Sequence, residues 1–442
     1  MGKEVPAVSR PAHLTMGELL RQFLPLSLSD MIMVLAGPII IAGLARLPNQ
    51  EVHLAAYGVA EAVAILIESP IIMLLHAANA LSRDPVSFKA LRRFMLWANL
   101  GLTLFYAVLA FTPLYDVIFR GWLGQPAAVA DAARPAFQVM LLWPAAIGWR
   151  RYFQGMLIAR KRSARVGAAS VYRLVSLAAT VVVGVLLRWP GAVVGGAALA
   201  VSVIVEAAIV TWFARNEKPE GEPLPHLPHS LGAVAAWYAP LALTAILIWV
   251  SKPAINGGLA RATEADLSLA AWPAIWTTAM LVANAIRMIQ QVVITQATSP
   301  ENYRVLTRFT WWAGVAASGL MALIGLSPAG GQLLTQVTGL SSHLTAVAVP
   351  ALRLLVLFPL GIALQNHYQG LLIRSGRTPA VNLGALVGSG VLFATLLLGV
   401  RAGWLGTVAG AAATMVGQVA EVGVLYLLTT RERAALTVTA SA

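Results

Sequence analysis

Residues 238–261 read YAPLALTAILIWVSKPAINGGLAR, an apolar run that a lysine and a proline interrupt. A run of about 20 apolar residues can cross a bilayer, so this segment predicts a transmembrane helix. Lys252 precedes Arg261 by 261 − 252 = 9 residues, about 13 Å of helix, which reaches toward the middle of a core about 30 Å thick. A lone ammonium in hydrocarbon costs about 2.5–3.5 kcal/mol, so we expect Lys252 to face a polar cavity. Pro253 indicates the same cavity, because it leaves the carbonyl of Trp249 without an N–H partner, which membrane helices tolerate where the backbone lines a cavity.

The same pattern occurs earlier in the chain. Residues 23–46 read FLPLSLSDMIMVLAGPIIIAGLAR, in which Pro25 and Pro38 match Pro240 and Pro253 at an offset of 240 − 25 = 215 residues. The same offset aligns further pairs without a gap, namely Pro85 with Pro300, Trp97 with Trp312, Pro144 with Pro359, Gln154-Gly155 with Gln369-Gly370, and Glu206 with Glu421. A constant register over this length indicates a tandem duplication.

The composition is that of an integral membrane protein. Of the 442 residues, 58% are hydrophobic and only 11% are charged, against about 25% charged residues in soluble domains. The absence of cysteine excludes disulfides, thiolate catalysis and cysteine-bound metal, and no other pattern predicts a metal or cofactor. The net charge of +13 is compatible with nucleic-acid binding, but most of the basic residues lie in short loops, where membrane topology explains them. We therefore predict no nucleic-acid partner.

Apolar runs predict twelve transmembrane helices. No segment keeps the alternation of apolar and polar residues that a membrane β-barrel requires. The runs are 17–45, 53–81, 92–114, 129–159, 164–187 and 190–214, then 233–260, 266–296, 305–327, 344–373, 379–400 and 404–429. The predicted organisation is a tail (1–15), an N-lobe of helices 1–6 (16–215), a linker (216–232), a C-lobe of helices 7–12 (233–430) and a tail (431–442). Because each repeat has an even number of spans, we expect the two lobes to be related by an axis along the membrane normal.

Loop charges predict the orientation. The loops on the side of the termini are rich in Lys and Arg, and the opposite loops hold little beyond Arg46, Arg120, Arg188, Arg261 and Arg401. By the positive-inside rule both termini are cytoplasmic, and we expect a multi-pass protein of the cell (inner) membrane. The first 16 residues have no apolar core, so they predict a short tail rather than a signal peptide.

Polar residues that differ between the repeats are the candidate site. Lys252, Asn256, Arg287 and His367 of the second repeat stand where the first has Gly37, Ile41, Ile72 and Tyr152. Cations and amides suit an anion with carboxylates or phosphates, which guanidinium can bind bidentately. The predicted substrate-binding residues are Lys252, Asn256, Asn284, Arg287, His367, Gln369, Gln154 and Arg150. Lys252 and Arg287 lie on consecutive spans, so we expect them to converge on an interlobe cavity.

The N-lobe carries acids that the C-lobe does not, namely Asp30, Glu61 and Glu68. They suit either coupling protons or counter-charges for the cations, and Asp30 is the residue we expect to titrate unless Lys252 lies close. Lys252 has a second interpretation as a permanent structural ion pair with Asp30 or Glu61. Arg150 and Gln154 fit a cavity wall or the cytoplasmic end of a long span equally well.

The two six-helix lobes, with a basic loop after an F/Y-Q-G segment, resemble the multidrug/oligosaccharidyl-lipid/polysaccharide exporter (MOP) superfamily, which includes the multidrug and toxin extrusion (MATE) transporters. Within it the chain is most similar to the progressive ankylosis (ANK) family. The matching segments are FLPLSLSD at 23–30, AAYG at 55–58, WYAPLAL at 237–243, Ser251-Lys252-Pro253 with Asn256, Ile286-Arg287, and His367 before Gly370. The family has arginine at the position of Lys252, which keeps the cation, and arginine near Gln365, where this chain is neutral.

The resemblance implies a MATE-like fold and export of small polyanions such as pyrophosphate, nucleotides or di- and tricarboxylates. The cationic C-lobe predicts the same substrate class, so we expect an alternating-access secondary transporter with a small-molecule anionic substrate, embedded in the bilayer and with protons as one coupling option. The alternative is a proton-coupled multidrug exporter of organic cations that uses the N-lobe acids and tryptophan walls. An enzyme is not expected, because the sequence has no HExxH, GxSxG or acid-rich metal motif.

Overall fold

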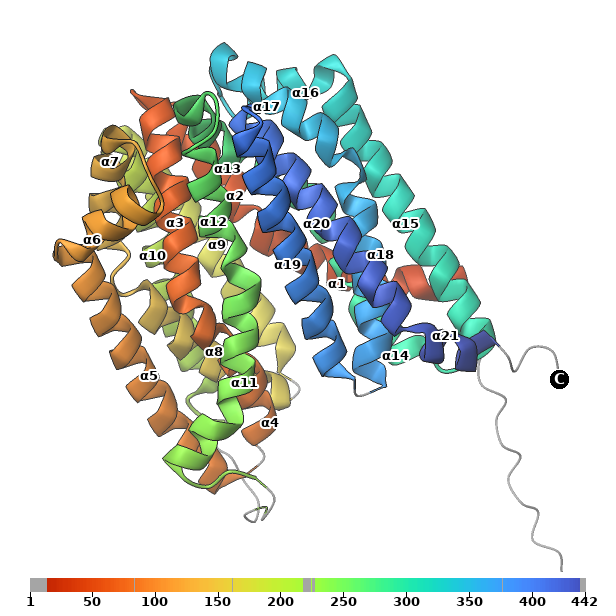
Figure 1. Ribbon diagram of the computed structural model, residues 1–442. Coiled ribbons are helices and arrows are strands. Elements are labelled where there is room, and N and C mark those ends of the chain that lie inside the picture. The colour runs from red at the N-terminus through yellow and green to blue at the C-terminus, as the bar shows by residue number, and fades with distance from the viewer. Residues whose placement is uncertain are drawn as a thin grey trace, which may run out of the picture.

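The computed structural model describes residues 14–82, 84–160, 162–217, 224, 227–375 and 377–437. Helices of the first repeat form one lobe and helices of the second form another beside it (Figure 1). The lobes converge at the end of the molecule that carries α7 and α17, and they separate toward the end that carries α21 and the C-terminus (Figure 1).

The two repeats form the same helices in the same order. The first repeat comprises α1 (Met16–Val34), α2 (Ala36–Leu44), α3 (Gln50–Ile72), α4 (Leu74–Leu81), α5 (Pro85–Phe111), α6 (Leu114–Asp116), the π-helix η1 (Val117–Trp122), α7 (Ala127–Val139), α8 (Trp143–Ala159), α9 (Ser163–Leu186) and α10 (Gly191–Ala214). The second comprises α11 (Leu231–Trp249), α12 (Ser251–Leu259), α13 (Ala265–Arg287), α14 (Ile289–Gln296), α15 (Pro300–Leu326), α16 (Pro328–Gln332), the π-helix η2 (Leu333–Val337), α17 (Ser342–Leu354), the 3₁₀ helix η3 (Leu355–Leu357), α18 (Phe358–Arg374), α19 (Thr378–Arg401) and α20 (Gly406–Leu428), followed by α21 (Thr430–Thr437).

Helix breaks recur at the 215-residue offset. The first span of each repeat breaks at Leu35 and at Val250, and the second span breaks at Met73 and at Met288. The break at Val250 lies three residues before Pro253, which has no N–H to donate to the carbonyl of Trp249. The twelve predicted spans are therefore present, and several are two helical segments joined at a kink.

A close crossing of α3 and α13 locates the axis that relates the lobes. Gly58 of α3 lies so close to Pro273 of α13 that a Cβ atom on the glycine would be 2.6 Å from the proline Cγ. The two residues are repeat mates, since 58 + 215 = 273. A residue contacts its own repeat mate only where a two-fold axis passes between them, so the axis runs through this contact. The all-helical structure, with the two repeats of six spans related across this contact, confirms the predicted fold class of two six-helix lobes.

The first segment of each repeat crosses to the other lobe. Phe23 of α1 packs edge-on against Phe309 of α15, with ring centroids 5.1 Å apart. The repeat-equivalent pair, Tyr238 of α11 and Phe94 of α5, lies at 5.0 Å. The predicted linker at 216–232 thus separates the repeats along the chain, whereas in space α1 packs on the C-lobe and α11 on the N-lobe.

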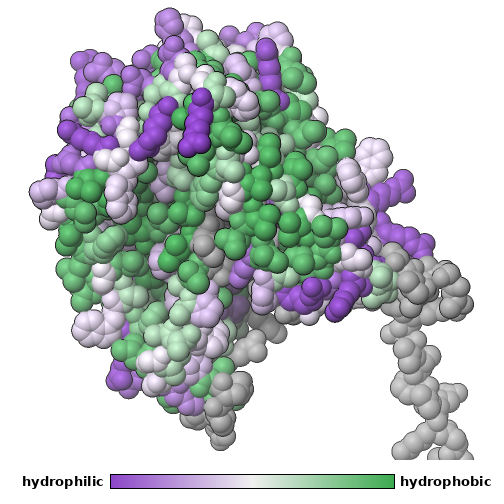
Figure 2. Space-filling view, viewed as in Figure 1, coloured by the Kyte–Doolittle hydropathy of each residue, from purple (hydrophilic) through white to green (hydrophobic). Residues whose placement is uncertain are grey.

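The outer helices present an apolar surface suited to lipid. Among the described residues, nine helices are long and apolar enough to cross a membrane. The other three spans are the kinked pairs α1–α2, α7–α8 and α11–α12. Large exposed apolar side chains gather on the outer helices, among them Trp97, Leu104, Leu323 and Leu398. Figure 2 shows an apolar band between polar residues at the two ends of the molecule, so the protein is a multi-pass membrane protein.

Asp84 attaches the linker to the N-lobe outside the predicted spans. Its side chain is fully buried and caps α5 by accepting hydrogen bonds from the Val86 N–H at 2.8 Å and the Ser87 hydroxyl at 2.9 Å. On the linker side it lies 2.7 Å from Nε2 of His229 and 3.3 Å from the backbone N of Leu224. One carboxylate therefore holds both a helix start and the interlobe linker.

We expect this attachment to weaken in acid. Burial raises the pKa of Asp84, but the hydrogen bonds from Ser87, Val86 N–H and His229 outweigh burial and lower the pKa to about 2. The folded pKa lies below the unfolded value of about 3.9, so the stabilisation is complete above that value and is lost as pH falls toward 2. Asp84→Ala should cost about 1 kcal/mol at pH 7 and much less near pH 2.5. Unfolding midpoints measured across this range test it; Ser299→Ala, the equivalent cap of α15, should show a cost that does not vary with pH.

Candidate functional site

A pocket on the pseudo-two-fold axis contains the lysine singled out by the sequence. Its volume is about 80 Å³, small beside the about 300 Å³ at which ligand pockets begin. It is lined by Gly58, Glu61 and Ala62 of α3, Ser251, Lys252, Ile255 and Asn256 of α12, Trp272, Pro273 and Trp276 of α13, and Leu392 and Thr414 of α19 and α20. We call this the interlobe pocket. Both lobes contribute walls, so any movement of one lobe against the other changes its size.

Lys252 is paired across the lobes in this conformation. Its Nζ lies 3.5 Å from Oε1 of Glu61 and 5.5 Å from the ring centroid of Trp249. The side chains of Lys252 and Glu61 are 20% and 27% exposed, so the pair is only partly removed from solvent. Lys252 faces a pocket with a largely apolar wall, and Glu61 is the acid in contact with it among the described side chains; that of Asp30 lies outside them.

Asn256 joins the lobes next to this pair. Its side-chain amide donates to the carbonyl of Gly58 at 3.3 Å, and its own carbonyl accepts from Nε2 of Gln125 at 3.3 Å. The residue is 5% exposed. In this conformation Asn256 holds α12 against the N-lobe while it also lines the interlobe pocket.

Arg287 lies on the same helix as the pocket wall but at another depth. It follows Trp276 along α13 by 287 − 276 = 11 residues, about 16 Å of helix toward the end of the molecule that carries the C-terminus. Its side chain is exposed and donates to Oδ1 of Asn284 at 3.4 Å. The structure therefore brings Arg287 and Asn284 together, as predicted, but it does not bring Arg287 to Lys252.

The two N-lobe residues in the predicted substrate set contact a buried glutamate. Arg150 forms an ion pair with Glu206, and Nε2 of Gln154 donates to the same carboxylate at 3.0 Å. Ser170 donates to it at 3.1 Å, and Arg173 lies 3.8 Å away. The Glu206 side chain is fully buried. The structure uses Arg150 and Gln154 to satisfy this carboxylate inside the N-lobe and does not place them at the interlobe pocket.

The C-lobe repeats the arrangement with neutral donors. Glu421 accepts from Nε2 of Gln365 at 2.6 Å and from Nε2 of Gln369 at 3.2 Å. Gln369 also accepts from Gln290 at 2.9 Å. Gln365 is the repeat mate of Arg150, so one glutamate is held by charge in the N-lobe and by amides in the C-lobe.

His367 packs inside the C-lobe. It is 2% exposed, its Nδ1 lies 2.9 Å from the hydroxyl of Thr310, and its ring is 5.7 Å from that of Tyr303. It does not line the interlobe pocket. His367 could contact a ligand only after a movement of the lobes that exposes its side chain.

The predicted acids have separate surroundings. Glu61 lines the pocket and pairs with Lys252. Glu68 is 5% exposed, and its Oε2 has no hydrogen-bond partner among the described residues. The side chain of Asp30 lies outside the part of the chain whose side chains are described, so its predicted titration stays a prediction. Within the described ranges, no three His, Asp or Glu side chains form a group that could hold a metal ion.

Sequence reasoning missed several members of these sites. Trp272, Trp276 and Thr414 line the pocket, and Arg173 approaches Glu206. A signal for Trp276 was present, because it is the repeat mate of Glu61 and repeat mates approach each other near the axis. No sequence signal identifies Thr414, since threonine is common in apolar helices.

The sequence matches no family model and no curated protein. Solved structures match over nearly the whole chain. An inward-facing multidrug resistance MATE family transporter of the MOP superfamily is 16% identical, with 96% of this chain and 99% of that chain covered and a TM-score of 0.76. A MOP superfamily transporter from Pyrococcus furiosus, described as having a binding pocket of reverse polarity, is 17% identical with 93% and 95% covered and a TM-score of 0.64. The lipid II flippase MurJ is 12% identical with 93% and 89% covered and a TM-score of 0.67.

The chain therefore has the fold of the MATE-like transporters of the MOP superfamily. The matched structures are those of transporters and a flippase, and the likeness to them shows the fold. The narrower resemblance to the ANK family gains no support from these matches.

Proposed function

We propose that this protein is an alternating-access secondary transporter that exports a small organic or phosphate polyanion, with Lys252 as the principal substrate cation. The observation that supports the proposal is the position of Lys252: it lies in a pocket on the axis between the two lobes, and among the described side chains it pairs with Glu61. An anion that displaces Glu61 from Lys252 would gain a charge-assisted hydrogen bond in a site partly shielded from water.

Arg287 supports the same proposal from a second position. It is exposed on α13, a helix that packs against both lobes, and no ion pair holds it within the described residues. A cation about 16 Å along that helix from the pocket gives an anion a first contact on its way to Lys252. Cytoplasmic termini and placement in the inner membrane belong to this proposal and rest on the loop charges. Export also belongs to it and rests on the resemblance to the ANK family.

The small volume of the interlobe pocket fits a transporter in a state in which the pocket is closed to substrate. A di- or tricarboxylate or a pyrophosphate needs more room than about 80 Å³ provides, so the lobes must separate at the pocket to admit it. The MATE-like fold, with two lobes hinged about an axis, permits such a movement. Within the superfamily we place the chain with the ANK family, on the Ser251-Lys252-Pro253 and Ile286-Arg287 segments.

A ligand screen of the purified protein tests the substrate class. We expect pyrophosphate, ATP or citrate to raise the unfolding temperature, because a ligand at 100 times its Kd stabilises the fold by about 2.7 kcal/mol. A lipophilic cation such as tetraphenylphosphonium should have no effect. Stabilisation by the cation and by no anion would overturn the proposal in favour of the organic-cation exporter. Uptake of the active anion into proteoliposomes then establishes transport.

A further inference from the structure

Two arginines at equivalent positions of the repeats join the lobes at the end opposite the C-terminus. Arg261 follows α12 and donates to backbone carbonyls at the end of η1, at 2.9 Å to Leu123 and 2.6 Å to Trp122. Arg46 follows α2 and donates to carbonyls at the end of η2, at 3.1 Å to Val337 and 3.4 Å to Thr338. In each case the arginine belongs to one lobe and the carbonyls to the other.

The two sets of contacts obey the repeat. Arg46 and Arg261 are repeat mates, and Trp122 and Leu123 are the mates of Val337 and Thr338, since 122 + 215 = 337 and 123 + 215 = 338. The contacts therefore stand on opposite sides of the axis that passes between Gly58 and Pro273. Opening the molecule at this end would break both at once.

Local structure prepares the acceptors. The last carbonyls of a helix have no partner within it and carry its negative partial charge, so they attract a guanidinium. Gly124 and Gly339 follow the two π-helices with φ of +63° and +80°, a conformation that favours glycine. A Cβ on Gly124 would lie 2.9 Å from Cζ of Arg261, so a side chain there would displace the guanidinium.

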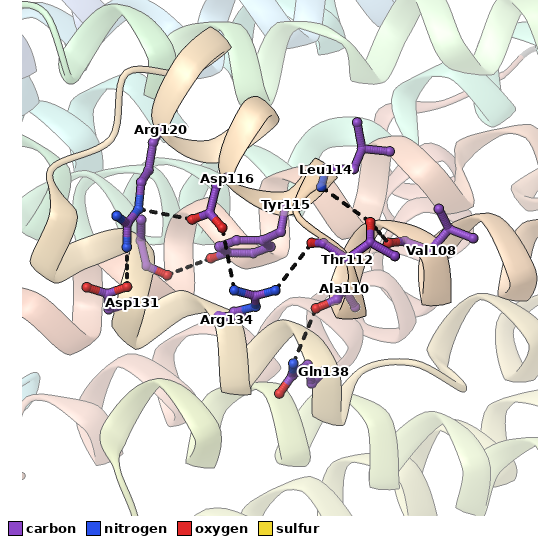
Figure 3. A network of polar contacts seen from close by, with 11 residues as sticks. Val108, Ala110, Thr112, Leu114, Tyr115, Asp116, Arg120, Asp131, Arg134 and Gln138 are labelled. Carbon is purple, nitrogen blue, oxygen red and sulfur yellow. Dashed lines mark hydrogen bonds and ion pairs between the residues drawn. The ribbon is translucent and has the colours of Figure 1, made fainter.

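The acceptor on the N-lobe is also held in place from behind (Figure 3). Arg120 of η1 pairs with Asp116 at 3.1 Å and with Asp131 of α7. Arg134 of α7 pairs with Asp116 at 3.5 Å, and the hydroxyl of Tyr115 donates to the carbonyl of Ala130 at 2.6 Å. Because η1 is fixed to α7, Arg261 contacts a rigid part of the lobe rather than a loose loop.

Each arginine also caps the C-terminus of its own helix. Arg261 also donates to the carbonyl of Gly257 at 2.8 Å, and Arg46 donates to that of Ala42, so each caps its own helix. A cap needs only those bonds. The additional bonds to the other lobe, made by both repeat mates, have no function in capping.

We propose that Arg46 and Arg261 form a symmetric latch that holds the lobes together at this end and must open when the transporter changes state. The arginines donate to backbone carbonyls, so the latch needs no acidic side chain as their partner. The proposal requires that the lobes move, but it does not require that the substrate is an anion.

Spin labels test the latch, and the natural absence of cysteine makes labelling simple. Ala128→Cys and His343→Cys place labels at exposed repeat mates on α7 and α17, one on each lobe. In the otherwise unchanged protein in detergent, we expect mainly short distances between the labels. In Arg46→Ala/Arg261→Ala we expect the long-distance population to rise at least about tenfold, since two sets of charge-assisted bonds are lost.

Arg188→Ala/Arg401→Ala is the matched control. It removes two exposed arginines at the same end, one in the loop after α9 and one at the last residue of α19, and neither makes an interlobe hydrogen bond in the described residues. Its distances should not change. If the double latch variant does not fold, Arg46→Ala and Arg261→Ala alone should each give an intermediate distribution. A distance distribution equal to that of the control in the folded latch variants would overturn the proposal, whether or not the protein transports an anion.

Discussion

Replacing Lys252 with alanine should reduce binding and transport of the polyanion about 10- to 150-fold. The reduction corresponds to the about 1.5–3 kcal/mol that a hydrogen bond to a charged group contributes. Lys252→Arg should retain most of the activity, because it keeps the cation. Arg353→Ala, which removes an exposed cation outside the interlobe pocket, should have little effect. Uptake by proteoliposomes containing equal amounts of each variant measures these changes.

Stability separates this role from a structural ion pair. Glu61 is 27% exposed, so in Lys252→Ala it can be hydrated, and the ligand-free protein should lose no more than about 1 kcal/mol. A structural pair predicts a loss of about 3–5 kcal/mol instead. Glu61→Gln removes the acid that competes with the substrate and should tighten anion binding. Transport by Lys252→Ala at the original rate contradicts the assignment of Lys252.

Replacing Arg150 with alanine should destabilise the protein by about 3–5 kcal/mol, because it removes the nearer cation of the fully buried Glu206 and leaves Arg173, 3.8 Å away, as the remaining one among the described residues. Gln154 and Ser170 still donate to the carboxylate, which favours the lower end of that range. Chemical unfolding in detergent, followed by the fluorescence of the 13 tryptophans, measures the change.

The repeat supplies the control for Arg150. Gln365→Ala removes the equivalent donor from Glu421, which keeps Gln369, and should cost less because no charge is lost. Arg150→Met combined with Glu206→Gln should recover only part of the stability, since it removes the buried pair but leaves Arg173 without its carboxylate partner. An Arg150→Ala protein that unfolds like the wild type but no longer binds the anion would restore Arg150 to the substrate site.

The sites together suggest how the proposed transporter distributes its charges. The charge that exchanges partners in the proposed transport cycle is at the axis, where Lys252 pairs with Glu61 between the lobes. The fixed charge is inside the N-lobe, where Arg150 and Glu206 are buried together. A cation that must exchange partners during transport has to be partly solvated, whereas a pair that maintains the lobe can be buried.

The predicted site residues fall into two groups, Lys252 at the interlobe pocket and three residues inside the lobes. Lys252 was found because charge within an apolar span is costly, and that cost depends on little beyond position along the helix. His367, Arg150 and Gln154 were assigned by residue type. Their contacts with Thr310 and Glu206 depend on which face of a helix points inward, and helices that are apolar on every side carry no periodic signal of that direction.

The sequence alone determined the membrane class of the protein, the twelve spans and the duplication, because hydropathy, span length and the repeat register are properties of the chain that do not depend on packing. Only the tertiary structure decided that α1 and α11 cross to the opposite lobes, that Glu61 is the partner of Lys252, and that Arg46 and Arg261 reach across the axis. These contacts join residues far apart in the chain and arise from how two lobes meet. In a bundle whose helix surfaces are apolar throughout, packing geometry and the few buried polar groups fix that arrangement, and hydrophobic pattern does not.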